Sequence, residues 1–296
     1  MPTSNRQGQG LLLAVTAALL FSAKAILVKL AFPYGVGPLT LLALRMGFAT
    51  PFFAVIAYRG RATGAPLRKR DWAALFGLGV LGYYGASYLD FFGLQYISAG
   101  LERLILFTYP TITMLISVVA FGRAFRRTDL FALGLTWVGI ALAFLHDVRL
   151  ADDASAVWIG GGCILGSAVC YAAYLAGCGE LIARLGSARV SALATCISAG
   201  ATLAHFGATR ALGELAQPWP VLALAAAMAV FCTVLPVFMN LAAMQQLGAS
   251  RTAIIGSIGP VFTIALAALF LDEHMSLTQL AGTALVTSGV WIAGSK

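Results

Sequence analysis

Ten apolar runs occupy most of the chain, and this pattern limits it to very few folds. The runs cover roughly residues 11–30, 38–58, 72–95, 100–121, 128–146, 157–179, 188–207, 219–246, 250–271 and 277–294. About 20 consecutive apolar residues cross a hydrocarbon core as a helix. Only 10% of the 296 residues are charged, whereas soluble domains have about 25%. The sequence therefore predicts an all-α polytopic membrane protein with ten transmembrane helices.

Other classes of protein fit this pattern poorly. Ten helices of a water-soluble bundle would need polar outer faces, and these runs have almost none. A transmembrane barrel requires alternating rather than continuous apolar residues. The first run is not read as a cleaved signal peptide, because it continues past Lys24 into Ile26 and Val28 and lacks a convincing cleavage site.

The two halves of the chain resemble each other when the sequence is shifted by 150 residues without a gap. This register aligns Gly10 with Gly160, Gln95 with Gln245, Ala99 with Ala249, Pro110 with Pro260 and Gly139 with Gly289. A polar connector near residues 147–156 separates a first repeat, 1–150, from a second, 151–296. Paired halves in an apolar chain are typical of secondary transporters, whose substrate site lies between the halves.

The distribution of positive charge predicts the orientation of the helices. If the N-terminus is cytoplasmic, 13 of the 19 Lys and Arg residues fall on the cytoplasmic side and four on the other, with Lys24 and Arg45 inside helices. This bias places both termini in the cytoplasm of a bacterial inner membrane. Five helices per repeat is an odd number, so the second repeat is inverted. The basic loop 123–127 aligns with the acidic and polar residues 273–277, as inversion requires.

Signatures of enzymes and cofactors are missing from the sequence. It contains no P-loop, GxSxG, HExxH or CxxC motif, so neither ATP hydrolysis, nor a metal, nor another cofactor is expected. The five cysteines fall in apolar runs and are interpreted as buried hydrophobic residues. The basic residues lie in short loops without interleaved aromatic residues, so nucleic acid is not a predicted partner. The expected partners are the lipid bilayer and a small-molecule substrate.

Five charged residues fall within or near the predicted spans. Burial of such groups in a membrane costs at least about 2.5–3.5 kcal/mol near a helix centre, so each should face a cavity or a partner. We expect the ammonium of Lys24 to face a cavity and to meet a substrate carboxylate. For Arg45 the favoured interpretation is a structural ion pair with Asp90 or Glu102. Glu102 and Arg103, near the outer end of their helix, are candidates for the same ion pairs or for a gate.

Aromatic and polar residues add to the candidate substrate site. The spacing of Tyr84, Tyr88, Phe91 and Gln95 places them on one helical face. The 150-residue shift adds Gln245 to this set and aligns Asp90 with Asn240, the second-repeat candidate beside it. A pocket lined by Tyr84, Tyr88, Tyr109, Tyr171 and Tyr174 would suit amphipathic or aromatic solutes. Plain core packing of these rings is the alternative.

Two prolines at equivalent positions are candidate hinges. Pro110 and Pro260 lie inside predicted helices, where each removes a backbone donor and should kink the helix. A static bend is the alternative to a hinge. His146, His205 and His274 are expected near the outer surface and are interpreted as interfacial bystanders, with a proton-sensing role as the alternative.

Several short patterns, in this order and spacing, resemble the drug/metabolite transporter superfamily in its EamA-like branch. They are Phe21-Ser22-Ala23 with Lys29, Leu44-Arg45-Met46, Tyr96-Ile97-Ser98-Ala99 leading to Tyr109-Pro110, Gln246-Leu247-Gly248-Ala249 leading to Gly259-Pro260, and Leu271-Asp272-Glu273-His274-Met275-Ser276. The chain is more narrowly similar to amino-acid exporters of the YddG type. That resemblance implies a ten-helix inverted repeat around a central cavity. Lys24 departs from the family pattern, which more often has an uncharged polar residue there.

These observations together predict a secondary transporter. It would export amino acids or similar small metabolites by alternating access, with the halves rocking about the proline kinks. Efflux of drugs or organic cations by the same fold is the alternative. An intramembrane enzyme or a scaffold is disfavoured, because the first should show clustered catalytic residues and the second needs no polar residues at mid-membrane.

Overall fold

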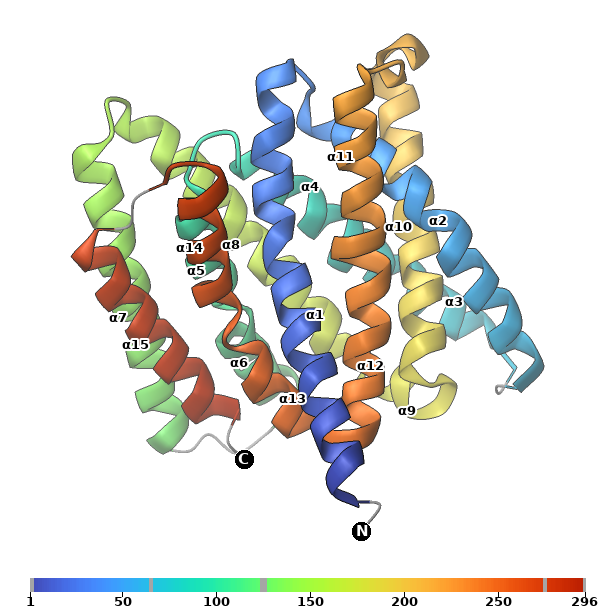
Figure 1. Cartoon of the computed structure of the whole chain (residues 1–296). Coiled ribbons are helices and arrows are strands. Elements are labelled where there is room, and N and C mark those ends of the chain that lie inside the picture. Colours follow the sequence, from blue (N-terminus) through green and yellow to red (C-terminus); the bar gives the residue numbers. More distant parts are fainter. Residues whose placement is uncertain (1–2, 64–65, 123–126, 274–275, 295–296) are drawn as a thin grey trace.

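The computed structural model describes residues 3–63, 66–122, 127–273 and 276–294, and every regular element in these ranges is helical. The described residues form ten helical rods that run side by side, and both chain ends lie at the same end of the molecule (Figure 1). The opposite end is called the distal end below. His274 and most of the 123–127 loop lie outside the described residues.

The first repeat contains α1 (Thr3–Ala31), the 3₁₀ turn η1 (Phe32–Tyr34), α2 (Pro38–Thr63), α3 (Lys69–Gly79), the π-helical turn η2 (Val80–Gly85), α4 (Ala86–Gly93), α5 (Ala99–Leu106), α6 (Tyr109–Phe121) and α7 (Arg127–Leu150). The second contains α8 (Ala154–Gly177), α9 (Gly179–Leu185), α10 (Ser187–Thr209), the 3₁₀ turn η3 (Leu212–Leu215), α11 (Trp219–Ala229), the π-helical turn η4 (Val230–Val234), α12 (Leu235–Leu247), α13 (Ala249–Gly256), α14 (Gly259–Phe270) and α15 (Leu277–Gly294).

The prediction of ten helices in two inverted five-helix repeats is confirmed, with several rods interrupted. The rods predicted at 100–121 and 250–271 are each broken in two, between α5 and α6 and between α13 and α14. Pro110 and Pro260 lie in the first turn of α6 and α14. A missing N–H costs little there, because the first turn has no intrahelical acceptor for it. The expected kinks are therefore helix breaks, and the short helix α9 was not predicted.

Interruptions occur at equivalent places in the two repeats. The π-helical turns η2 and η4 begin at Val80 and Val230, exactly one repeat length apart. The helices α5 and α13 also begin and end one repeat length apart. π-helical turns are rare in proteins overall, and many of those that occur lie at functional sites. The inverted repeat therefore extends to the irregularities of the helices as well as to their number.

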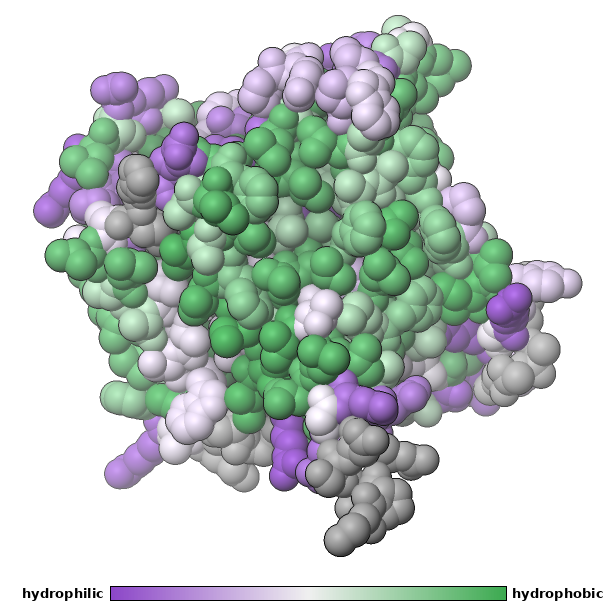
Figure 2. All heavy atoms as spheres, in the orientation of Figure 1, coloured by the Kyte–Doolittle hydropathy of each residue, from purple (hydrophilic) through white to green (hydrophobic). Residues whose placement is uncertain are grey.

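The surface of the rods is suited to lipid. Seven described helices are long and apolar enough to cross a membrane by themselves, and two shorter apolar helices accompany them. Figure 2 shows apolar side chains across the middle of the face in view and hydrophilic ones gathered towards its two ends. A helix needs such a continuous apolar exterior to remain in hydrocarbon.

The first helix of each repeat packs on the other repeat. The helix α1 lies against α12 and α14, whereas α8 lies against α4 and α6. At the edge of the molecule α7 and α15 pack together along their length (Figure 1). Glycine allows this close approach, since a Cβ atom built on Gly139 would lie 2.6 Å from the carbonyl oxygen of Gly282. Because α1 and α8 each pack on the opposite repeat, side chains of both repeats meet at the centre of the molecule.

Candidate functional site

A buried ion-pair network joins three helices of the first repeat. Lys24 Nζ on α1 lies 2.5 Å from Asp90 Oδ2 on α4 and 3.2 Å from Glu102 Oε1 on α5. Asp90 is 2% and Glu102 0% exposed. Buried charges are tolerated only when they are paired and hydrogen-bonded. Lys24 is thus held by two carboxylates, and the predicted free ammonium is not present in this arrangement.

Four buried polar atoms around this network have no hydrogen-bond partner in the described part of the chain. Two are the acceptors Asp90 Oδ1 and Glu102 Oε2, and two are the donors Arg45 Nη1 and Arg103 Nε. Arg45 interacts electrostatically with Asp90, Arg103 interacts with Glu102, and the side chains of Asp90 and Glu102 interact with each other. An unpaired buried polar atom costs about 1–3 kcal/mol. These four residues and Lys24, called the charged cluster below, therefore include buried donors and acceptors that have no hydrogen-bond partner among the described residues.

Arg45 forms no direct salt bridge among the described residues, although it interacts electrostatically with Asp90, one of its two predicted partners. Its Nε donates to Thr233 Oγ1 at 3.1 Å, and its guanidinium lies 5.3 Å from the centre of the Phe91 ring. The carboxylates of Asp90 and Glu102 are taken by Lys24 instead, within the described residues. The helix α2 also packs on α4, but the Nε of Arg45 turns to Thr233 in η4, and Lys24 on α1 lies between the two acids instead.

Arg103 contacts the broken helix of the other repeat. Its Nη2 donates to Ser22 Oγ at 3.5 Å, and its guanidinium lies over the ring of Phe107 at 5.1 Å. Ser22 Oγ lies within hydrogen-bond distance of two carbonyl oxygens, that of Ala18 at 2.7 Å and that of Gly259 at 2.9 Å. A Cβ atom on Gly259 would lie 2.8 Å from Arg103 Nη2, so a larger residue there would displace the guanidinium from this position. Arg103 therefore links the charged cluster to the break that precedes Pro260.

The predicted tyrosine pocket divides into two separate groups of rings. Tyr109 lies 5.0 Å from Tyr171, which stacks on Tyr174 at 6.2 Å, and Tyr174 meets Tyr83 at 4.9 Å. These four residues form the tyrosine cluster, which draws on α6, α8 and η2. Tyr174 is 3% exposed. Tyr83 was not predicted, although the 150-residue shift aligns it with the polar Thr233.

The other two tyrosines face α10. Tyr84 OH lies 2.7 Å from His205 Nδ1, and the ring of Tyr88 meets His205 edge-on at 5.2 Å. These residues adjoin a pocket of about 390 Å³ at the distal end, the distal pocket, which is lined by Pro38, Leu39, Tyr88, Phe92, Gln95, His205, Thr209 and Arg210. His205 was interpreted as an interfacial bystander, and it contacts both tyrosines and lines the distal pocket.

The third rod consists of α3, η2 and α4, and the aromatic residues that share its face differ from the predicted ones. Tyr88 is followed by Phe92 at 6.3 Å and then Tyr96 at 5.4 Å, at steps of four residues. Phe91 is fully buried beneath Arg45 instead. The predicted stripe through Phe91 was wrong, because a step of three after Tyr88 turns the side chain away from α10 and into the core.

The remaining candidates lie apart from the charged cluster. Gln95 is exposed and lines the distal pocket. Its equivalent Gln245 is exposed near the end of α12, and Asn240 is half-buried on the same helix. The hydrogen bonds and ion pairs of Lys24 involve neither second-repeat residue in the part of the chain that the structure describes.

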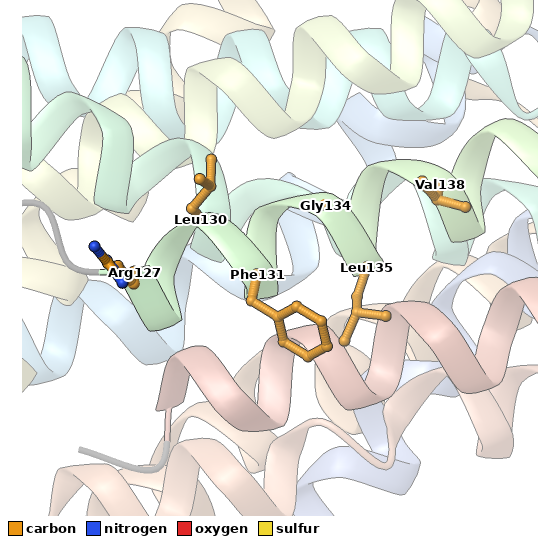
Figure 3. A pocket seen from close by; sticks show the side chains of 6 residues that line it. All are labelled: Arg127, Leu130, Phe131, Gly134, Leu135 and Val138. Carbon is orange, nitrogen blue, oxygen red and sulfur yellow. The ribbon is translucent and has the colours of Figure 1, made fainter.

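A second hollow lies on the outside of the molecule. It measures about 470 Å³ and is lined by six residues of α7 alone, namely Arg127, Leu130, Phe131, Gly134, Leu135 and Val138 (Figure 3). Its side chains are almost all apolar, and Leu130 and Phe131 are well exposed. A hollow on a single apolar helix is a surface for lipid tails, so it adds no substrate site.

The two repeats use equivalent positions for different chemistry. Arg45 on α2 contacts Thr233 in η4. The positions one repeat length away, Thr195 on α10 and Tyr83 in η2, also interact through their side chains. Lys24 likewise corresponds to Tyr174. The same helix contacts thus carry charges near the distal end and neutral hydroxyl groups near the chain termini.

Comparisons with known proteins agree with this architecture. The sequence profile of the EamA-like transporter family matches twice, at residues 8–145 and 158–295, so both ends of the match shift by 150 residues. The chain is 31% identical over 282 residues to a protein described as "Uncharacterized transporter YcbK" from Bacillus subtilis, covering 92% of this chain and 88% of that one.

Two further similarities extend over nearly the whole chain. A protein described as "Uncharacterized transporter sll1319" from Synechocystis is 24% identical over 315 residues, covering 97% of this chain and 93% of the relative. A solved structure described only as "Crystal structure of protein" shares the fold, with a TM-score of 0.63, 19% identity, and coverage of 97% and 96%. The chain belongs to the EamA-like transporter family of the drug/metabolite transporter superfamily, and is a multi-pass membrane transporter rather than an enzyme.

Proposed function

We propose that the protein exports amino acids or similar small zwitterionic metabolites across the bacterial inner membrane by alternating access. The observation that carries this proposal is the charged cluster. Its unpartnered acceptors, Asp90 Oδ1 and Glu102 Oε2, match a substrate ammonium. Its unpartnered donors, Arg45 Nη1 and Arg103 Nε, match a substrate carboxylate. A zwitterion is the simplest small molecule that satisfies both.

The pairing of Lys24 suggests how such a substrate is held and released. A substrate ammonium would compete with Lys24 for the two carboxylates, because all three groups lie within one hydrogen-bonded network. Lys24 would replace the substrate when it leaves, so neither carboxylate is left unpaired inside the membrane. A buried charge without a partner is strongly destabilising, and this exchange keeps the two carboxylates paired in both states.

The packing of the repeats supports alternating access. Ser22 and Lys24 on α1 contact opposite repeats, the first at Gly259 and the second at Asp90 and Glu102. The breaks before Pro110 and Pro260 provide places where helices can bend. A rocking motion about these breaks would open the charged cluster on one side and the tyrosine cluster on the other.

Orientation and direction rest on the sequence. The excess of Lys and Arg in the loops on one side supports cytoplasmic termini, and the distal end would then face outwards. The resemblance to exporters of the YddG type supports export of amino acids. The printed descriptions of the relatives name no substrate.

Counterflow in proteoliposomes tests this proposal with a matched series of competitors. For each transported amino acid, the N-acetyl derivative keeps only the carboxylate and the methyl ester keeps only the ammonium. We expect both derivatives to compete at least tenfold more weakly than the amino acid, since each leaves half of the charged cluster unsatisfied. Asp90→Asn should abolish most transport, whereas Asp152→Asn, an exposed acid beyond the end of α7, should not. Absence of counterflow for every amino acid tested would refute the proposal.

Efflux of organic cations is the second candidate, and the pairing of Lys24 favours it. Two carboxylates surround one ammonium, so a cationic drug could take one carboxylate while Lys24 keeps the other, without needing an anionic group. A methyl ester that competes as well as its parent amino acid, together with counterflow of an organic cation, would select this function over amino-acid export.

A further inference from the structure

The distal pocket is a built cavity separate from the charged cluster. It lies between the first turn of α2, the end of α4 and the end of α10, and its volume of about 390 Å³ is in the range of small-molecule sites. Tyr88 contributes its ring to this pocket, whereas Asp90, two residues further on, turns to Lys24. The same rod therefore presents two faces to two different environments.

Aromatic rings form one wall of the distal pocket. Tyr88 and Phe92 lie 6.3 Å apart with their planes inclined by 35°. The hydrogen bond between Tyr84 and His205 and the edge-on contact with Tyr88 fix the ring of His205 beside them. Leu39 and Pro38 complete the apolar lining. Rings held in this way bind flat apolar molecules through offset or edge-to-face contacts.

A positive charge stands at the rim of the same pocket. Arg210 directly follows the end of α10, and its side chain is 52% exposed. Its nearest acid, Glu214, lies 3.9 Å away, which is a long and exposed contact. Exposed pairs of this kind hold their partners weakly, so the guanidinium is free to bind an anion. Gln95 uses its Nε2 to donate to the carbonyl oxygen of Phe92, which leaves its side-chain oxygen as an acceptor.

We propose that the distal pocket is a second binding site, which takes a flat aromatic molecule that carries a carboxylate. The ring lies against Tyr88 and Phe92, and the carboxylate accepts hydrogen bonds from Arg210. An ammonium is not required, because the pocket lining contains no acidic side chain among the described residues. This site does not depend on the proposed function of the charged cluster.

Calorimetry with purified protein in phosphatidylcholine nanodiscs tests the site. The probe is indole-3-acetate, which has a ring and a carboxylate but no ammonium, and its neutral match is indole-3-acetamide. We expect the acid to bind at least tenfold more tightly than the amide. Arg210→Gln should remove this preference, and Tyr88→Leu should weaken both ligands at least fivefold. Arg149→Gln, which changes an exposed arginine at the same end of the molecule, should have no effect.

Three results would overturn the proposal. Equal affinity for acid and amide would show that the rim charge plays no part. Loss of binding in Arg149→Gln would reduce the effect to general surface charge. Loss of binding when phosphatidylglycerol replaces phosphatidylcholine would assign Arg210 to a lipid headgroup. Asp90→Asn should keep full affinity for indole-3-acetate even if it abolishes transport, so failure of this site and failure of the proposed function are distinguishable.

Discussion

Lys24 and Asp90 are 66 residues apart in the chain, and the 2.5 Å contact between Lys24 Nζ and Asp90 Oδ2 joins α1 to α4. Glu102 completes the contact from α5. One ammonium therefore holds two carboxylates together in a buried environment. The first prediction concerns the loss of stability when the ammonium of Lys24 is removed, alone or together with the carboxylate of Glu102.

Lys24→Met should destabilise the protein strongly, because it leaves two carboxylates buried without their cation. Removal of one partner of a buried ion pair costs about 3–5 kcal/mol. The double variant Lys24→Met with Glu102→Gln should regain part of that loss, since it removes one unpaired charge. Thermal unfolding in detergent measures both. If the two substitutions are simply additive, the side chains are not coupled as described.

Thr233→Val should lower the unfolding temperature, because it takes the acceptor from Arg45 Nε. A buried donor left without its partner costs about 1–3 kcal/mol. Thr233→Ser keeps the hydroxyl group and should behave like the native protein. Unfolding curves of the three proteins test this prediction. An equal loss of stability in both variants would assign the effect to the methyl group of Thr233 rather than to its hydroxyl group.

Gly139→Ala should disturb the packing of α7 on α15, since its Cβ atom would lie 2.6 Å from the carbonyl oxygen of Gly282. Gly134 on the same helix has no neighbouring atom within 4 Å of such a Cβ atom. Alanine in a helix is otherwise favoured over glycine by about 0.5–1 kcal/mol. We therefore expect a lower unfolding temperature for Gly139→Ala and an unchanged or higher one for Gly134→Ala. A stabilised Gly139→Ala would show that the helices are further apart.

Glu273→Ala should weaken a contact between the repeats at the distal end. Its carboxylate accepts hydrogen bonds from the backbone N–H groups of Ala99, at 3.0 Å, and Gly100, at 3.4 Å, and so caps α5 from the loop before α15. Loss of a cap costs about 0.5–2 kcal/mol. Cysteine introduced at Gly100 should then react faster with a membrane-impermeant maleimide added from the distal side. Asp152→Ala, which changes an exposed acid at the same end, is the control. Equal labelling rates with and without Glu273→Ala would contradict the contact between Glu273 and the start of α5.

The number of helices and their relative orientation could be predicted from the sequence, because the length of apolar runs and the charge of loops are local properties. It also identified Lys24, Asp90 and Glu102 as groups that need partners. It mispaired Arg45, because the choice of partner depends on which helices lie side by side, and no periodicity encodes that. Tyr83 and Thr233 were missed although they are polar at equivalent positions, and a search for such pairs would have found them.

The grouping of the aromatic residues was beyond sequence reasoning for a different reason. Tyr84 and Tyr88 belong to a face towards α10, whereas Tyr109, Tyr171 and Tyr174 meet near α8. A regular α-helix was assumed throughout the third rod, and the π-helical turn η2 changes the direction of every side chain relative to those before it. Local propensities give no signal for such a turn.

The π-helical turns also constrain how the chain can change in length. Each residue advances an α-helix by roughly 100°, and a π-helical turn accommodates one extra residue. Deletion of one residue within Val80–Gly85 would let the rod close into a regular helix and rotate α4 by about that angle, which would carry Asp90 away from Lys24. Insertions and deletions in this turn therefore change the charged cluster itself, even though the turn contributes no charged group to it.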